Sequence, residues 1–155
     1  AVDLGRGLGR LLGWELIDVP GATGYLDTNY RGKGEAACAA LDRADVVTVH
    51  VEAPDEAGHN GDPVAKKLAL ERIDEYIVGP IIRRLEGFGG WRVLLMPDHP
   101  TPIRVRSHTP EPVPFVRAGS DVPANGAGRF TEAEAAQTGL VVDPGWRLME
   151  RLLRG

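Results

Sequence analysis

The chain has 155 residues, a formal charge of −4 at pH 7 and 43% hydrophobic residues, values typical of one globular domain. Its 18 Lys and Arg residues are scattered rather than clustered, so the sequence gives no basic surface for nucleic acid. No apolar run approaches the ~20 residues that span a bilayer and no signal pattern opens the chain, so we expect a cytoplasmic protein without a membrane partner.

Helices and strands alternate along the chain by hydrophobic spacing, Pro and Gly signals and capping residues. In chain order we predict a helix at 2–12 ended by Gly13, a strand at 14–19, a turn at 20–24, a helix at 34–43, a strand at 45–52, a helix at 64–78 that kinks or restarts at Gly79-Pro80, a helix at 81–85, strands at 91–96 and 115–118, a helix capped by Thr131 and a helix at 144–153. This order predicts an α/β fold, a three-layer sandwich around a mostly parallel sheet.

Two polar motifs each follow a predicted strand. PDEAGHNGD comes after the strand at 45–52, and PDHPTP comes after the strand at 91–96. Open parallel sheets bind ligands beyond the carboxyl ends of their strands, so we expect both motifs at the functional edge.

These motifs carry candidate metal ligands. Asp55 and His59 are four residues apart, which brings them to one side of a helical turn, and Gly58 between them would let the backbone approach an ion. Asp98 and His99 are adjacent in the second motif, and His108 follows in SHTPEPVP.

Carboxylates and imidazoles without a thiolate suit Mn²⁺, Zn²⁺ or Co²⁺ better than Ca²⁺, and Mn²⁺ is our first choice. Two such ions ~3.5–4 Å apart stabilise both oxygens of an in-line displacement at phosphorus. Taken singly, each residue could instead be a solvated loop residue. His50, inside the strand-like VVTVHVE, is predicted to be structural, as is the single cysteine, Cys38, which we expect to be buried.

The motifs resemble those of the cofactor-independent phosphoglycerate mutases of archaeal type, in the alkaline phosphatase superfamily. VHVEAPDEAGHNGD, LLMPDHPTP and SHTPEPVPF are similar to that family's metal-binding segments, in the same order and at similar spacing. GRGLGRLLGWELIDVPGATGYLDT and ALERIDEYIVGPI are similar to further family segments, so the resemblance covers nearly the whole chain.

The resemblance implies a partial alkaline-phosphatase-like domain with two divalent metal ions, Mn²⁺ first, with Zn²⁺, Co²⁺ or Mg²⁺ as alternatives. Asp55, His59 and His108 would bind one ion, and Asp98 and His99 would help to bind the other. The implied reaction interconverts 3-phosphoglycerate and 2-phosphoglycerate through a phosphoserine enzyme, so the partner is a small phosphorylated metabolite.

The chain also departs from the family pattern. Family members are longer, so residues 1–155 correspond to the C-terminal part of the metalloenzyme domain, and the nucleophilic serine lies in an N-terminal part that is absent. Ser107 and Ser120 are the only serines, and neither has a recognisable nucleophile setting. Arg6, in GRGLGR, is a candidate for binding the substrate phosphate, with a solvated helix arginine as the alternative. We therefore expect the isolated chain to be nearly inactive.

Two other functions fit the same residues. Another metal-dependent phosphatase or phosphotransferase of the superfamily would use identical ligands, because substrate choice depends on parts of the protein outside the motifs. An inactive metal-binding fragment would also lack a nucleophile. The sequence does not indicate which oligomeric state the protein adopts.

Overall fold

The computed structural model describes residues 2–154, which form two compact units. The first unit contains residues 2–87 together with Thr101–Ser107, and the second contains residues 88–100 and 108–154. The chain therefore leaves the second unit after Pro100 and returns to it at His108. None of the described helices combines the length and apolar character that crossing a membrane requires.

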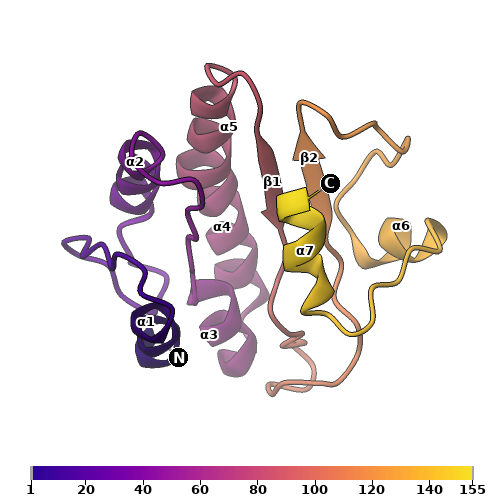
Figure 1. The fold of residues 1–155 in the computed structure, drawn as a ribbon. Coiled ribbons are helices and arrows are strands. Elements are labelled where there is room, and N and C mark those ends of the chain that lie inside the picture. The colour runs from indigo at the N-terminus through magenta and orange to yellow at the C-terminus, as the bar shows by residue number, and fades with distance from the viewer. Residues whose placement is uncertain (1, 155) are drawn as a thin grey trace. The chain divides into compact units, whose positions relative to one another are not determined.

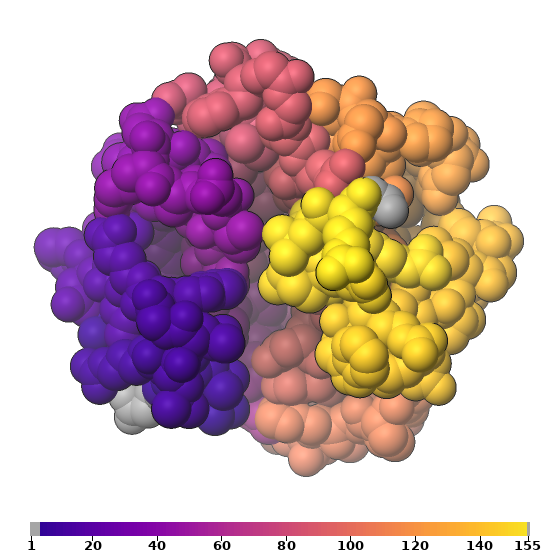
Figure 2. All heavy atoms as spheres, viewed as in Figure 1, coloured from indigo at the N-terminus to yellow at the C-terminus, as the bar shows by residue number. Residues whose placement is uncertain are grey.

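The first unit is built from helices. They are α1 (Val2–Leu11), α2 (Tyr30–Ala40), α3 (Ala53–Asn60), α4 (Pro63–Ile73), the π-helix η1 (Asp74–Val78) and α5 (Gly79–Leu85). α4, η1 and α5 follow one another without a break and form one long column in Figure 1. α1 lies on the face turned toward the viewer in Figure 2, and its Leu4, Leu8 and Leu11 are exposed.

Capping residues set several helix ends. The Asn29 side chain accepts a hydrogen bond from the Gly32 backbone N–H, so α2 begins at Tyr30, earlier than the predicted start at residue 34. Asp62 caps α4 by accepting from the Val64 and Ala65 backbone N–H groups. Gly13, with φ +71°, confirms the predicted stop after α1.

At Gly79-Pro80, where a kink or a restart was predicted, the π-helical turn η1 ends and α5 begins. The Gly79 N–H donates to the carbonyl of Asp74, five residues earlier, and the chain then continues directly into α5. Pro80 has no N–H to give to a carbonyl four residues back. The wider turn just before Pro80 therefore lets the helix continue.

The core of the first unit lies where α2 meets η1. Tyr30, Ala53, Ala69 and Ile77 form its buried cluster. A Cβ atom at Gly34 would collide with the Tyr76 carbonyl oxygen, so glycine is what allows α2 to approach η1 this closely.

The predicted strands at 14–19 and 45–52 are corrected by the structure: within residues 2–154 neither segment forms a β-ladder. The alternation in the second segment has a physical basis, since Val49 and Val51 pack on the core. A strand also needs a neighbour for its backbone groups. Here a side chain supplies one such partner, because Lys33 Nζ donates to the His50 carbonyl at 2.8 Å. Burial lowers the pKa of Lys33.

The second unit contains the sheet. β1 (Arg92–Leu95) pairs with β2 (Val116–Gly119), with Arg92 opposite Gly119 and Leu95 opposite Val116. Both strands were predicted, but their pairing is antiparallel. The described residues thus contain helices and a two-stranded antiparallel sheet, and the mostly parallel three-layer sandwich is not confirmed.

The second unit also holds two helices, α6 (Glu132–Gln137) and α7 (Arg147–Arg154). Thr131 caps α6 as predicted, accepting from the Glu134 N–H. Arg92 joins β1 to the end of α7 by donating to the Leu152 and Leu153 carbonyls. The same guanidinium, hydrogen-bonded to Asp121, holds the pKa of that carboxyl below its ordinary value.

Candidate metal centre

Asp55 and His59 lie on α3, one turn apart. Asp55 Oδ2 is 3.3 Å from His59 Nε2, which confirms that the two side chains share one side of a helical turn. Two ligands of a tetrahedral zinc ion, each ~2.0–2.1 Å from the metal, are about 3.3 Å from each other. The α3 pair therefore has the spacing of two ligands on one ion.

The other nitrogen of His59 is held by the backbone. His59 Nδ1 lies 3.1 Å from the Arg106 carbonyl oxygen. A carbonyl can only accept, so Nδ1 is the donor in this contact, and Nε2 is the ring nitrogen that faces Asp55. Such a contact fixes the ring and its tautomer for metal binding.

Asp55 is held by Thr101, in the short segment Thr101–Ser107 that belongs to the same unit. The Thr101 hydroxyl donates to Asp55 Oδ1, and the opposite oxygen, Oδ2, is the one that faces His59. Thr101 is only 4% exposed, and its carbonyl accepts from Lys66 Nζ at 2.7 Å. The segment is thus anchored from two helices, α3 and α4.

Gly58, between the two α3 ligand candidates, lies against Thr101. A Cβ atom there would lie 2.6 Å from the Thr101 carbonyl oxygen and 2.8 Å from Thr101 Cγ2. The absence of a side chain at Gly58 therefore allows the close approach of Thr101.

Asp98, His99 and His108 belong to the second unit. His99 Nε2 lies 3.4 Å from Asp98 Oδ2, so this pair also has the spacing of two ligands on one ion. The rings of His99 and His108 lie side by side, with centroids 3.7 Å apart and planes tilted by 32°. A hydrogen bond from the Thr109 N–H to the Pro100 carbonyl connects the two chain segments that carry them.

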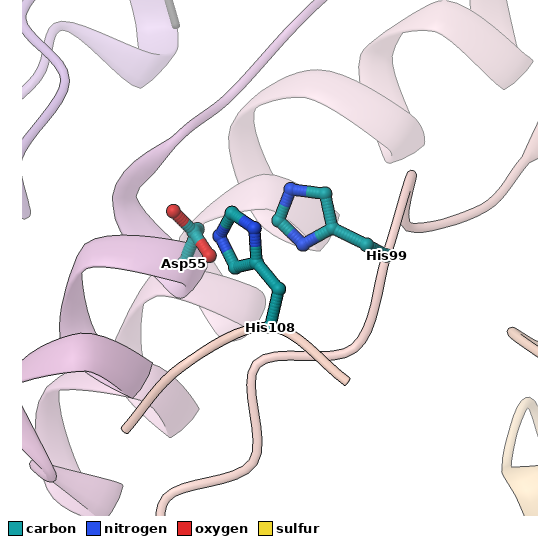
Figure 3. A group of neighbouring side chains, drawn as sticks. All are labelled: Asp55, His99 and His108. Carbon is teal, nitrogen blue, oxygen red and sulfur yellow. The ribbon is translucent and has the colours of Figure 1, made fainter. Parts of the chain in front are cut away.

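Figure 3 shows Asp55 projecting from α3, and His99 and His108 projecting from coil segments. Asp55 offers a carboxylate oxygen, and each histidine offers an imidazole nitrogen. Oxygen and nitrogen donors without sulfur suit Mn²⁺, Zn²⁺ or Co²⁺. The donor set of these residues fits a divalent transition metal.

The remaining candidates have structural partners. Arg6 on α1 donates to Asp18 Oδ1 at 2.7 Å. Ser120 Oγ accepts from the Trp91 N–H at 3.1 Å, where the sheet ends. His50 is exposed, and Cys38, which was predicted to be buried, is only half-buried, with its pKa raised mainly by burial.

The sequence patterns did not identify three residues that contact a candidate ligand or its support: Thr101, Lys66 and Arg106. Thr101 stands inside PDHPTP, three residues after Asp98, and that position was the available signal. No sequence signal pointed to Lys66 or Arg106. Lys66 is 35 positions from Thr101, and Arg106 is 47 positions from His59.

Comparison with known proteins identifies a family of metalloenzymes. The sequence profile described as the metalloenzyme superfamily matches residues 5–143. A 2,3-bisphosphoglycerate-independent phosphoglycerate mutase from Methanothrix thermoacetophila is 52% identical over 156 residues, which cover 100% of this chain and 40% of that protein. The protein named 2,3-bisphosphoglycerate-independent phosphoglycerate mutase 2 in Methanothermobacter thermautotrophicus is 47% identical, over 99% of this chain and 38% of its own length.

A solved structure is similar as well. The PH0037 protein from Pyrococcus horikoshii matches with a TM-score of 0.81 and 34% identity, over 88% of this chain and 41% of that one. The chain thus spans about 40% of the length of the curated relative from Methanothrix. With the superfamily profile matched over most of its length, the chain belongs to the metalloenzyme superfamily.

Proposed function

We propose that this chain is the metal-binding, C-terminal part of a cytoplasmic phosphoglycerate mutase. The whole protein would interconvert 3-phosphoglycerate and 2-phosphoglycerate without bisphosphoglycerate. The observation that carries the proposal is the pair of carboxylate–imidazole spacings, 3.3 Å on α3 and 3.4 Å at Asp98 and His99. The names of the Methanothrix and Methanothermobacter relatives point to the same reaction.

In this proposal two divalent ions, Mn²⁺ first, use the five predicted ligands. Asp55, His59 and His108 hold one ion, and Asp98 with His99 contributes to the other. Chain connectivity supports a shared site. Thr101 contacts Asp55, Arg106 contacts His59, and each of these two anchors lies two residues from a histidine of the second group, His99 or His108. Consecutive Cα atoms are 3.80 Å apart across a trans peptide, so each histidine backbone is within about 7.6 Å of its anchor.

The bound ions would supply positive charge at the transferring phosphoryl group and its oxygens. The chain's own residues orient the ligands: Thr101 holds Asp55, and the Arg106 carbonyl holds His59. The nucleophilic serine and the remaining metal ligands would come from the part of the protein outside this chain. Arg6, on α1, is proposed to contact the substrate phosphate, for which it would exchange its partner Asp18.

We extend the proposal to the fold. The segments 14–19 and 45–52 would be strands of a mostly parallel, alkaline-phosphatase-like sheet in the whole protein, paired with strands from its other part. This accounts for segments that alternate like strands and have no ladder among the described residues.

The test is an assay of the whole protein with 3-phosphoglycerate and Mn²⁺, followed by phosphorus NMR. We expect 2-phosphoglycerate to form without added bisphosphoglycerate, and we expect an Asp98→Ala variant to lose this activity. Absence of the isomer in protein with confirmed metal occupancy would refute the mutase. Release of inorganic phosphate from general esters, with no isomer formed, would instead identify a phosphatase.

A further inference from the structure

A cavity with charged and aromatic side chains lies in the first unit, between the start of α2 and the α4–η1 column. Its volume is about 590 Å³, and it is shallow and widely open to solvent. The residues that line it include five with charged or aromatic side chains: Asp27, Tyr30, Arg31, Arg72 and Tyr76. None of them belongs to the candidate metal centre.

Two guanidinium groups of this cavity are stacked on aromatic rings. Arg31 Cζ lies 4.8 Å from the centroid of the Tyr76 ring, and Arg72 Cζ lies 5.8 Å from the centroid of the Tyr30 ring. Stacking engages the face of a guanidinium and leaves the N–H groups at its edge to donate. One edge group of Arg72 donates to the Leu26 carbonyl at 2.9 Å, which fixes the orientation of the plane.

Tyr30 adds a donor without a partner. The residue is 4% exposed, and its hydroxyl is buried without a hydrogen-bond partner. A buried hydroxyl left unsatisfied costs free energy, and an acceptor supplied by a ligand would remove that cost. Burial raises the pKa of Tyr30, so the hydroxyl keeps its proton at neutral pH.

The charge of the cavity also favours an anion. Arg31 and Arg72 contribute two positive charges, and Asp27 contributes one negative charge. The Asp27 carboxylate already accepts a hydrogen bond from the Thr23 hydroxyl at 2.8 Å. Planar guanidinium groups match the paired oxygens of carboxylates and phosphates.

The π-helical turn positions one wall of the cavity. Tyr76 lies in η1, and π-turns inside α-helices occur frequently at functional sites. The wide turn places Tyr76 beneath Arg31 of α2, while Gly34 allows the two helices to approach each other.

We propose that this cavity binds a small molecule through an oxyanion, a phosphate or a carboxylate, held by the edge N–H groups of Arg31 and Arg72 and by the Tyr30 hydroxyl. This site is separate from the metal ligands, and it does not depend on the proposed mutase reaction.

The test uses inorganic phosphate and acetate as probes, titrated into the protein in the presence of a chelator so that bound metal cannot capture them. Amide NMR resonances report the binding. We expect saturable shifts at Asn29, Tyr30 and Arg31 with at least one probe. Shifts with phosphate alone would identify a phosphate ester as the ligand class, and shifts with acetate would identify a carboxylate.

Variants then locate the site. Arg31→Met and Arg72→Met should each weaken binding about tenfold or more, the loss expected when a charge-assisted hydrogen bond is removed. Tyr30→Phe should weaken binding without lowering thermal stability, because the hydroxyl it removes has no partner. Arg147→Met is the matched control, since Arg147 stacks on Trp146 but does not line the cavity, and it should bind like the wild type.

Equal binding by all variants, or an absence of saturable shifts at α2 with either probe, would overturn the proposal. Arg31 is exposed, so its variant is not expected to unfold the protein. It therefore remains informative even if Arg72→Met disturbs the Leu26 contact.

Discussion

At the scale of single residues, Thr101 is the least obvious member of the candidate metal centre. It offers no ligand of its own in our proposal, yet its hydroxyl determines which Asp55 oxygen faces His59. Residues that orient metal ligands typically contribute 10–100-fold to metal affinity. Thr101 is therefore a positioning residue, held in turn by Lys66.

We predict that Thr101→Val lowers Mn²⁺ affinity by about 10–100-fold, because valine keeps the shape of threonine but cannot donate to Asp55. Thr101→Ser should restore most of the affinity. Thr109→Val is the matched control, since the Thr109 hydroxyl is buried without a partner, and it should leave the affinity unchanged. Titration calorimetry measures all three, and unchanged affinity in Thr101→Val would show that the contact does not orient a ligand.

The candidate ligands could be predicted from the sequence because their signals are local. Asp55 and His59 are four residues apart, and Asp98 and His99 are adjacent. The supporting contacts could not be predicted, because their partners are far apart in the chain. Thr101 is 46 positions from Asp55, and Arg106 is 47 positions from His59. Gly58 illustrates the difference, since only the structure identifies Thr101 as the group it accommodates.

At the scale of secondary structure, the approach of α2 to η1 depends on one missing side chain. The Cβ of any other residue at Gly34 would collide with the Tyr76 carbonyl oxygen, which is backbone and cannot rotate away. Overpacking of this kind costs about 1–3 kcal/mol or more. Tyr76, whose carbonyl makes this contact, also lines the cavity that contains Arg31 and Arg72.

We predict that Gly34→Ala lowers the free energy of unfolding by at least about 1–3 kcal/mol. Gly5→Ala is the control: Gly5 lies inside α1, and a Cβ atom there would have no other atom within 4 Å, so alanine should stabilise that helix by roughly 0.5–1 kcal/mol. Urea unfolding of the two variants measures both changes. A Gly34→Ala protein as stable as the wild type would mean that α2 and η1 can move apart freely.

Most helices were predictable here, although α3 lies where a polar loop was expected, and sheet pairing was not predictable, for a physical reason. A helix satisfies its backbone within a few residues, so spacing and capping signals identified α1, α4 and α6. A strand needs a partner that can lie anywhere in the chain. The segment 45–52 alternates like a strand without a ladder, and β1 pairs antiparallel with β2 rather than in the predicted parallel sheet.

At the scale of the whole molecule, the two units are not consecutive stretches of sequence. The chain passes between them after residues 87, 100 and 107. A truncation after residue 87 would remove Thr101 and Arg106, the partners of Asp55 and His59. The first unit therefore cannot be produced intact as a simple N-terminal piece.

We predict that metal binding stabilises the protein as a whole. At a free Mn²⁺ concentration 100 times the Kd, one bound ion adds about 2.7 kcal/mol, which raises the Tm of a protein of this size by roughly 5–10 °C. Removing the metal with a chelator should reverse this increase. Thermal melts with and without chelator, together with metal analysis, measure the effect.

The double variant Asp98→Ala, His99→Ala should lose much of this stabilisation and of the bound metal. Asp45→Ala, His50→Ala is the matched control, because it removes one exposed aspartate and one exposed histidine outside the proposed ligands. If the first double variant kept its metal content and its Tm increase, these two residues would not be ligands.

In the proposed two-metal site, the anchoring of Thr101–Ser107 on α3 would make the binding of the two ions cooperative. Coupling between two binding events is reciprocal: if the Thr101 contact strengthens metal binding at Asp55 by some factor, bound metal strengthens the anchoring by the same factor. His99 lies two residues before this segment and His108 lies one residue after it. Loosening the segment would therefore free both histidines at once. Loss of one ion would then lower the affinity for the other, and the protein would pass between metal-loaded and metal-free forms with few half-loaded molecules.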